Sequence, residues 1–210
     1  MLFRSQWAYN TYSVTYAANG GSGTMTDTNS PYTSGDTGAT FTVLGNGFTA
    51  PANKHFTGWN SAVDGSGTSY TVGSDYTITG SVTLYAQWAY DTYSLTYDVN
   101  GGTGSVPTDA NDYIIHDVAD VQFTPAPTRD GYDFLGWSET STDTAATYTA
   151  SGTTTLTFGS TDITLYAIWE LIDYDITYDL NDAGGQAATN AAGNPDTYNY
   201  ESGLITLDDP

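Results

Sequence analysis

The stretch FTGW at residues 56–59 returns as FLGW at residues 134–137, and this repetition determines the predicted fold. Two other phrases return with it, in the same order. YSVTYAANGG (12–21) is followed later by YSLTYDVNGG (93–102), and LYAQW (84–88) by LYAIW (165–169). Self-similarity at a fixed spacing is the signature of a tandem-repeat protein. The sequence therefore predicts several copies of one small domain.

The spacing of the repeated phrases sets the predicted domain boundaries. Trp7, Trp88 and Trp169 are spaced at equal intervals of 81 residues (88 − 7 and 169 − 88). The Trp residues of the two FxGW motifs, by contrast, are 78 residues apart (137 − 59). A few residues were therefore inserted or deleted inside the unit. The predicted divisions are the closing strand of a preceding repeat (1–11), repeat 1 (12–92), repeat 2 (93–173) and the first half of a truncated repeat 3 (174–210).

Each unit is predicted to open and to close with a β-strand. Residues 93–99 alternate between apolar or aromatic and polar side chains, a period of two that indicates a strand with one buried face. The Asn-Gly-Gly at 100–102 favours a tight turn and hence a hairpin. LYAIW (165–169) is apolar on both sides, which is typical of a central strand. Because no segment forms a convincing amphipathic helix, the predicted class is mostly β, leaning towards α+β.

Six residues of the repeated phrases are predicted to be structural anchors. The Trp residues are expected in the cores, and the Gly before each FxGW Trp is expected to let another backbone or ring approach closely. The anchors are Gly58, Trp59, Trp88, Gly136, Trp137 and Trp169. Only residues 89–92 separate the closing Trp of repeat 1 from the opening Tyr of repeat 2, and so short a linker predicts an elongated rod of repeats in a fixed relation.

Composition excludes several classes of function. The 24 Asp and Glu residues against 3 Lys and Arg give a formal charge of −21, which repels nucleic acid and anionic lipid headgroups. The absence of Cys excludes disulfides and thiolate metal sites. No run approaches the roughly 18 apolar residues of a membrane-spanning helix, so no membrane insertion is predicted for this segment. The thinly spread acidity among Thr, Ser, Asn and Gly favours an extracellular setting.

The three phrases in this order resemble the Listeria–Bacteroides repeat, also called the internalin B-repeat family. The resemblance covers nearly all of 12–173 and the first half of a copy in 174–210. It implies a β-grasp-like, SUMO-like fold, which is a small curled sheet with one short helix. It also implies tandem arrays in bacterial cell-surface proteins and adhesins, where the copies serve as stalk and interaction modules. Three features depart from the family: the units are longer than usual, the helix region is weak, and repeat 1 has Lys54-His55 where DGY is expected.

Residue types that carry catalysis do not recur from one repeat to the next. The two histidines, His55 and His116, fall at different places in their repeats, and a repeated enzyme would repeat its machinery. We therefore predict no catalytic and no cofactor-binding residues. Asp residues in turns ordinarily make local hydrogen bonds. Calcium is the one metal that the sequence leaves open, with candidate ligands near the joints at Asp91, Asp98, Asp173 and Asp175.

Three functions agree with these observations. The favoured one is a non-catalytic spacer or stalk segment of a large tandem-repeat bacterial adhesin, located at the cell surface, whose partners are the neighbouring repeats. The second is a module that binds a surface glycan or a host protein through exposed aromatics such as Tyr32, Tyr70, Tyr76, Tyr113 and Tyr148. The third is self-association, in which an extracellular filament grows by strand addition at incomplete end repeats.

Overall fold

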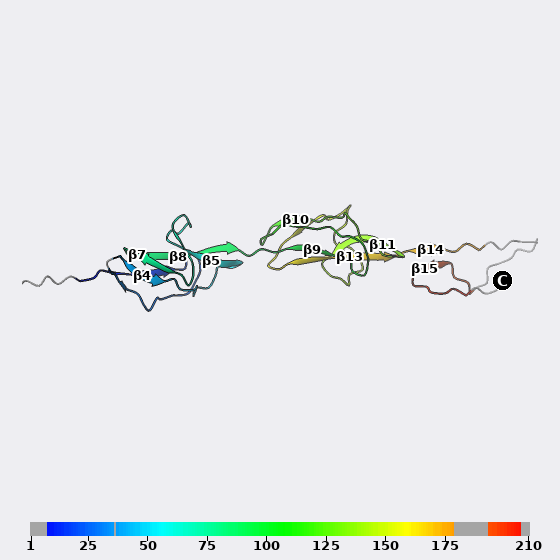
Figure 1. The fold of residues 1–210 in the computed structure, drawn as a ribbon. Coiled ribbons are helices and arrows are strands. Elements are labelled where there is room, and N and C mark those ends of the chain that lie inside the picture. Colours follow the sequence, from blue (N-terminus) through cyan, green and yellow to red (C-terminus); the bar gives the residue numbers. More distant parts are fainter. Residues whose placement is uncertain (1–7, 36, 179–192, 207–210) are drawn as a thin grey trace, which may run out of the picture. The chain divides into compact units, whose positions relative to one another are not determined.

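The computed structural model describes residues 8–35, 37–178 and 193–206, and the chain divides into two compact units, 1–91 and 92–210 (Figure 1). Strands and loops make up the described residues of both units, so the mostly-β prediction is confirmed. The short helix that the family resemblance implies does not occur in these residues. Small strand pairs lie in its place, because alternating segments such as Ala39–Thr42 bury every second side chain, as strands do.

The main sheet of unit 1 has its first strand beside its last. The described strands are β1 (Thr11–Tyr12), β2 (Val14–Ala17), β3 (Tyr32–Thr33), β4 (Ala39–Thr42), β5 (Lys54–Asn60), β6 (Ser69–Tyr70), β7 (Asp75–Ile78) and β8 (Val82–Tyr90). The order is β2-β8-β5-β6, with β8 parallel to β2 and antiparallel to β5. Two smaller antiparallel pairs, β4–β7 and β1–β3, complete the unit.

Unit 2 repeats this arrangement. Its described strands are β9 (Leu95–Asp98), β10 (Val118–Asp120), β11 (Tyr132–Ser138), β12 (Thr155–Thr157), β13 (Ile163–Leu171), β14 (Asp173–Asp175) and β15 (Thr197–Asn199). The sheet order is β11-β13-β9, with β13 parallel to β9 and antiparallel to β11. The β10–β12 pair corresponds to β4–β7, and β14 pairs with β15 after the sheet. One sheet order therefore serves both copies of the repeated phrases.

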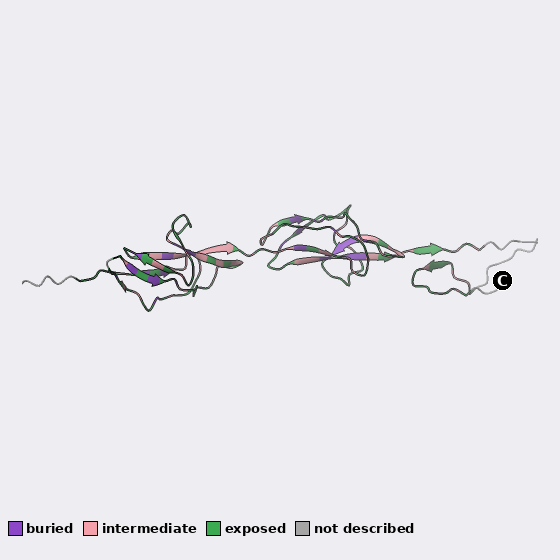
Figure 2. Ribbon diagram, in the orientation of Figure 1, coloured by how far each residue is buried: buried purple, intermediate pink, exposed green. Residues whose placement is uncertain are grey.

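Each unit has its own hydrophobic core, seen as the buried segments of Figure 2. In unit 1, Phe41 of the β4–β7 pair and Trp59 of the main sheet belong to one buried cluster. In unit 2, Leu156 of the β10–β12 pair and Trp137 of the main sheet do the same. The small strand pairs thus cover one side of the main sheet, which is the role that a helix would otherwise have.

The Asn-Gly-Gly phrase forms the predicted tight turn but not the predicted hairpin. Asn100 and Gly101 both have positive φ, at 45° and 83°, and the Gly102 amide donates to the Val99 carbonyl at 2.9 Å. These are the angles of a turn that favours Asn-Gly. A Cβ at Gly102 would overlap the indole of Trp169, so the chain leaves the turn across this ring. It then pairs with Thr128 instead of returning along β9, and the hairpin prediction is wrong.

A β-bulge explains the four-letter spacing of the FxGW motif. In β11, Phe134 faces Trp169 and Gly136 faces Ile168, so Leu135 is an extra residue in the strand. Residues three apart in a regular strand point to opposite faces. The bulge reverses this for Phe134 and Trp137, whose ring centroids are 5.0 Å apart. The register of β5 shifts at the same place in its FTGW, so both motifs direct two aromatic rings into one core.

Candidate functional site

The candidate functional residues begin with four aromatic side chains that recur in each core. In unit 2, the rings of Tyr97 and Trp137 lie 4.9 Å apart at 67°, and those of Phe134 and Trp169 lie 5.6 Å apart. The corresponding separations in unit 1 are 4.8 Å for Tyr16–Trp59 and 5.7 Å for Phe56–Trp88. Three of these four contacts are edge-to-face and the Phe134–Trp169 contact is tilted; aromatic pairs of this kind stabilise a core beyond simple burial. Both FxGW Trp residues are fully buried, whereas the closing Trp residues are half-buried.

In unit 2, two of these aromatic side chains form hydrogen bonds with the backbone of the same residue, Gln122. Trp137 Nε1 donates to the Gln122 carbonyl and the Gln122 amide donates to the Tyr97 hydroxyl, both at 2.9 Å. Unit 1 has the same pair of 2.9 Å bonds at Leu44. Burial raises the pKa of Tyr97 above its usual value, which keeps the hydroxyl protonated. This clamp on the segment before the FxGW strand was not predicted from the sequence.

The asparagine of each Asn-Gly-Gly turn also binds the closing strand. Asn100 Nδ2 donates to the carbonyls of Ala167 and Ser141, both at 2.8 Å. Asn19 Nδ2 donates in the same way to Ala86 at 2.8 Å and to Val63 at 2.9 Å. Sequence reasoning assigned these asparagines to the turn alone. The same asparagine stands at this position in both repeats, and this recurrence was the signal in the sequence for a role beyond the turn.

The two anchor glycines have different surroundings. At Gly136, with φ of 138°, an added Cβ would overlap the carbonyl oxygen of Tyr148. At Gly58, with φ of 155°, no heavy atom lies within 4 Å of that position. In repeat 2, the close approach of the Tyr148 carbonyl leaves no room for a side chain at Gly136. In repeat 1, the positive φ of Gly58 is the only constraint found on that residue.

The four calcium candidates make local hydrogen bonds or stand in the solvent. Asp91 Oδ1 lies 2.9 Å from His55 Nδ1, and Asp98 Oδ1 accepts the Asn100 amide at 2.7 Å. Asp173 accepts from Asn199 Nδ2 at 2.7 Å, and Asp175 is exposed two residues further along β14. Among the described residues, no three His, Cys, Asp or Glu side chains converge as a metal site would require. Calcium binding stays a prediction.

The two histidines lie in separate units and lack the partners of a catalytic base. His55 contacts Asp91, and the side chains of these two residues are 57% and 39% exposed. His116 has a positive φ of 72°, and its amide donates to the Phe158 carbonyl. In the part of the chain that the structure describes, no Ser or Thr hydroxyl is hydrogen-bonded to either imidazole. These residues contain no nucleophile–base pair.

The five tyrosines offered as an exposed binding surface pack against the cores: Tyr148 is buried, so its expected exposure is wrong, and the other four are half-buried. Tyr148 is 6% exposed and its hydroxyl donates to Glu139 at 2.7 Å. The hydroxyls of Tyr32 and Tyr113 donate to aspartate oxygens, also at 2.7 Å. Tyr70 and Tyr76 pack against each other with ring centroids 4.7 Å apart. The alternation of aromatic and polar residues predicts which side chains share one face of a strand. It does not predict which of the two faces is covered by another part of the chain.

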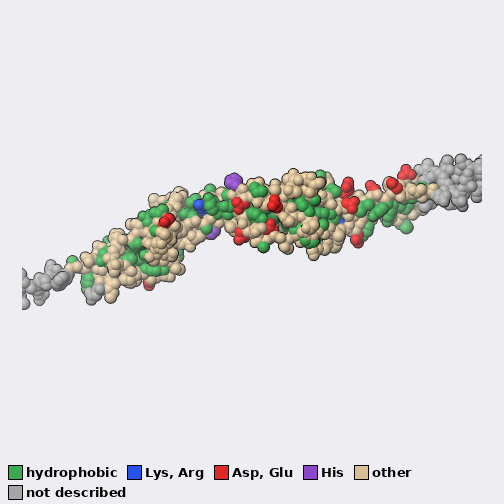
Figure 3. All heavy atoms as spheres, turned by 90° about the horizontal axis from the view of Figure 1, so that it is seen from above, with side chains coloured by type: hydrophobic (Ala, Val, Ile, Leu, Met, Phe, Trp, Pro, Cys, Tyr) green, Lys and Arg blue, Asp and Glu red, His purple; other side chains and the backbone are tan. Residues whose placement is uncertain are grey.

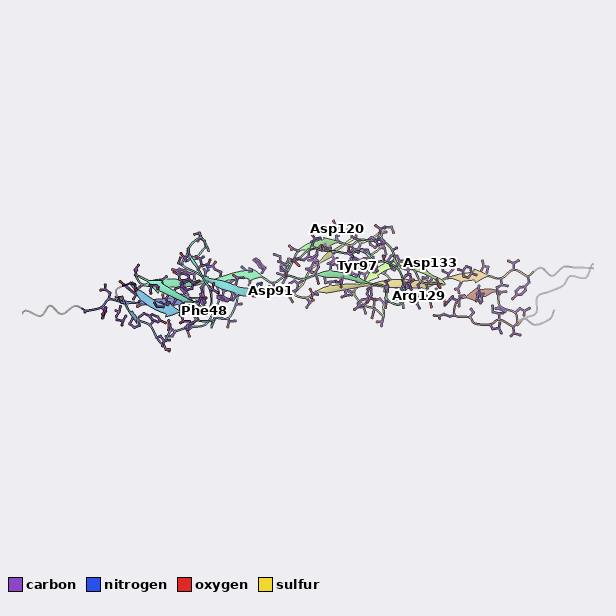
Figure 4. The ribbon with its side chains drawn as sticks, in the orientation of Figure 1. Phe48, Asp91, Tyr97, Asp120, Arg129 and Asp133 are labelled. Atoms are coloured by element: carbon purple, nitrogen blue, oxygen red, sulfur yellow. The ribbon has the colours of Figure 1, made fainter. Side chains whose placement is uncertain are left out.

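Each unit has a corner just before its FxGW strand, formed by a residue with positive φ. Asn53 has φ of 57° and Gly131 has φ of 77°. The carbonyl of each accepts the amide of a residue that follows the closing phrase, Asp91 in unit 1 and Ile172 in unit 2, both at 2.9 Å. Figure 4 labels Arg129 beside the second corner. The corner therefore fixes where the chain leaves one repeat.

Carboxylates dominate the charged surface. On the face shown in Figure 3, Asp and Glu side chains are spread over unit 2, and Lys or Arg appears at few places. The described part of the chain has no helix able to span a lipid bilayer.

Comparison with known proteins gives one family and several longer relatives. The model of the Listeria-Bacteroides repeat domain matches residues 12–87 and 93–168. A protein of Evansella cellulosilytica, named as a Gly-rich membrane protein, is 30% identical over 186 residues, which are 84% of this chain and 19% of that protein. Internalin H of Listeria monocytogenes is 33% identical over 96 residues, which are 45% of this chain and 16% of Internalin H.

A second protein of Evansella cellulosilytica, named as a membrane protein, is 29% identical over 188 residues, which are 86% of this chain and 24% of that protein. The chain spans about a fifth of the length of these curated relatives. No solved structure matches it.

Proposed function

Because the chain belongs to the Listeria-Bacteroides repeat domain family, we propose that it is a non-catalytic stalk segment of a tandem-repeat adhesin at the bacterial cell surface. The observation that carries this proposal is what recurs between the two units. The side chains that return at equivalent positions, such as the Asn100 amide and the Tyr97 hydroxyl, bind the repeat's own backbone. Repetition that serves stability alone is what a spacer requires.

The relatives support the surface location. Two are named as membrane proteins and one as an internalin, and each is several times longer than this chain. A formal charge of −21 on a surface rich in Thr and Ser keeps an extended array soluble and free of non-specific partners. We also assign each repeat to a β-grasp-like fold in which strand pairs replace the helix, supported by the small mixed sheet with parallel first and last strands.

Mass and shape in solution test the stalk. We would combine light scattering with small-angle X-ray scattering, in calcium and in chelator. A single compact domain of this length has a radius of gyration near ~17 Å, and repeats placed end to end give roughly 25–30 Å. A monomer at the larger value in both conditions is expected. A monomer near the smaller value would overturn the rod.

The same experiment separates self-association from the stalk. Binding of a glycan or a host protein stays a prediction that scattering does not test; of the five tyrosines proposed for it, Tyr148 is buried and the other four are half-buried. Self-association by strand addition stays a prediction, and masses in multiples of 22.3 kDa would favour it over the stalk.

A further inference from the structure

The strand pair β14–β15 has no buried side chain of its own. All three residues of β14 are exposed, and those of β15 are exposed or half-buried. Tyr174 and Tyr198, directly opposite each other, are 52% and 39% exposed. An isolated two-stranded hairpin is marginal in water. The pair therefore needs a contact outside itself to be ordered.

That contact lies at the corner of repeat 2. The Ile172 amide, one residue before β14, donates to the Gly131 carbonyl at 2.9 Å. Tyr200 directly follows β15, and its ring lies over Gly131. A Cβ added at Gly131 would overlap the Cβ and Cγ atoms of Tyr200. The neighbouring ring thus leaves no room for a side chain at this corner, where φ is 77°.

A second pair of side chains joins the same two elements. The Tyr132 hydroxyl donates to Glu201 Oε1, and the Arg129 guanidinium lies 3.7 Å from the centroid of the Tyr132 ring. This cation–π contact holds the face of the Tyr132 ring, while Glu201 binds its hydroxyl. The hydrogen bond that the Tyr132 hydroxyl donates to Glu201 is the main reason that the pKa of Tyr132 is raised.

Charge favours the same arrangement. Between residues 92 and 206, Arg129 is the only Lys or Arg in the sequence. It lines a hollow of about 410 Å³ together with Tyr132, Tyr200 and Glu201. In so acidic a chain, a carboxylate that arrives beside this cation meets less repulsion than elsewhere on the surface.

We propose that the corner at residues 129–132 is a docking site for the repeat that follows in the chain, and that the Tyr200–Glu201 turn is what it binds. The order of β14–β15 then depends on repeat 2, in the manner of nearest-neighbour coupling in repeat proteins. This inference goes beyond the stalk proposal. It concerns contact between successive repeats, and it holds whether or not the array is a spacer.

The replacement Gly131→Asn tests the docking with little disturbance of repeat 2. Asn53 occupies the corresponding corner of repeat 1 with φ of 57°, so Asn tolerates this backbone conformation. Its Cβ would displace the Tyr200 ring. The matched control is Gly203→Asn in the same segment, where φ is 67° and no heavy atom lies within 4 Å of an added Cβ.

The readout is amide hydrogen exchange of the whole chain, followed residue by residue by NMR. In Gly131→Asn we expect exchange of Ile172 and of the β14–β15 amides to accelerate by about tenfold, with β9 and β13 unchanged. Gly203→Asn should leave both sets unchanged. Unchanged exchange of β14–β15 in Gly131→Asn would overturn the proposal.

Tyr200→Ala removes the same contact from the other side. Because residue 200 lies outside repeat 2, this variant tests the docking even if Gly131→Asn perturbs repeat 2 itself. It should accelerate the same amides by a similar factor, and the double variant should add nothing further. Additive effects of the two changes would also overturn the proposal. Failure here leaves the scattering result untouched, so docking and stalk are judged separately.

Discussion

The indole N–H of Trp137 lies 2.9 Å from the carbonyl oxygen of Gln122, a residue whose own amide is bound by Tyr97. The equivalent bonds at Leu44 have the same lengths. Tyr97, labelled in Figure 4, lies on β9, and Trp137 lies on β11; both strands belong to unit 2 (Figure 1). The clamp thus ties three parts of the repeat together, and its loss should be measurable in either copy.

Trp137→Ala should destabilise unit 2 by about 3–5 kcal/mol, since it removes a fully buried ring and leaves a cavity. Urea unfolding followed by circular dichroism would measure this. Trp59→Ala should produce a loss of similar size in unit 1. Tyr90→Phe, at a side chain that is 48% exposed, is the control and should change stability by less than about 0.5 kcal/mol.

Tyr16→Phe should destabilise its unit more than Tyr97→Phe. Both remove the acceptor of one backbone amide, but the bond to Leu44 is partly buried and the bond to Gln122 is exposed to solvent. Water can replace the lost acceptor at Gln122, so we expect about 1–2 kcal/mol for Tyr16→Phe and less than about 1 kcal/mol for Tyr97→Phe. Equal losses in denaturant titrations would show that solvent access does not govern these bonds.

Asn100 has two roles that substitution can separate. Asn100→Gly keeps the positive φ but removes the two hydrogen bonds to Ala167 and Ser141, for an expected loss of about 1–2 kcal/mol. Asn100→Ala loses the bonds and strains the turn as well, so it should cost about 1 kcal/mol more. If both variants unfold at the same denaturant concentration, the turn conformation contributes nothing measurable.

Stability should fall at alkaline pH. Burial, followed by the hydrogen bond to Glu139, raises the pKa of Tyr148, and burial with the bond to Asp27 raises that of Tyr32. A tyrosine with a raised pKa in the folded state stabilises the fold fully below its unfolded pKa of about 10. That contribution is lost as the pH rises above this value towards the folded pKa.

Melting temperatures measured from pH 8 to pH 11 should therefore decline above about pH 10. Tyr148→Phe should make this decline shallower, because the replaced ring does not titrate. A decline of the same steepness in the variant would assign the alkaline loss to other groups.

Removal of calcium should leave the melting temperature unchanged. The oxygens of Asp91, Asp98 and Asp173 already take part in local hydrogen bonds with His55, Asn100 and Asn199. A cation that bound only the folded chain would raise the melting temperature, and would raise it further as the cation concentration increased above its dissociation constant. A rise on adding calcium, reversed by chelator, would establish a site that these contacts do not suggest.

The repeated phrases predicted the strands and the turn, because period-two alternation and Asn-Gly are local signals. The hairpin failed for a non-local reason, since the Trp169 ring directs the chain away after Gly102. The roles of Asn100 and Tyr97 were missed because their partners lie 67 and 25 residues away. The contact of Gly131 with Tyr200 lies outside every repeated phrase, and no spacing in the sequence indicates it.

The parallel pairing of β9 with β13 has a consequence for how the chain is made. Leu95 is paired with Ile163, 68 residues further along, so the opening strand of a repeat has no sheet partner until its closing strand has been synthesised. Contacts between such distant residues slow folding, because a long loop must close first. A repeat emerging from a ribosome or a secretion channel therefore stays unfolded for most of its length, and each copy becomes a domain only when its final LYAxW phrase has emerged.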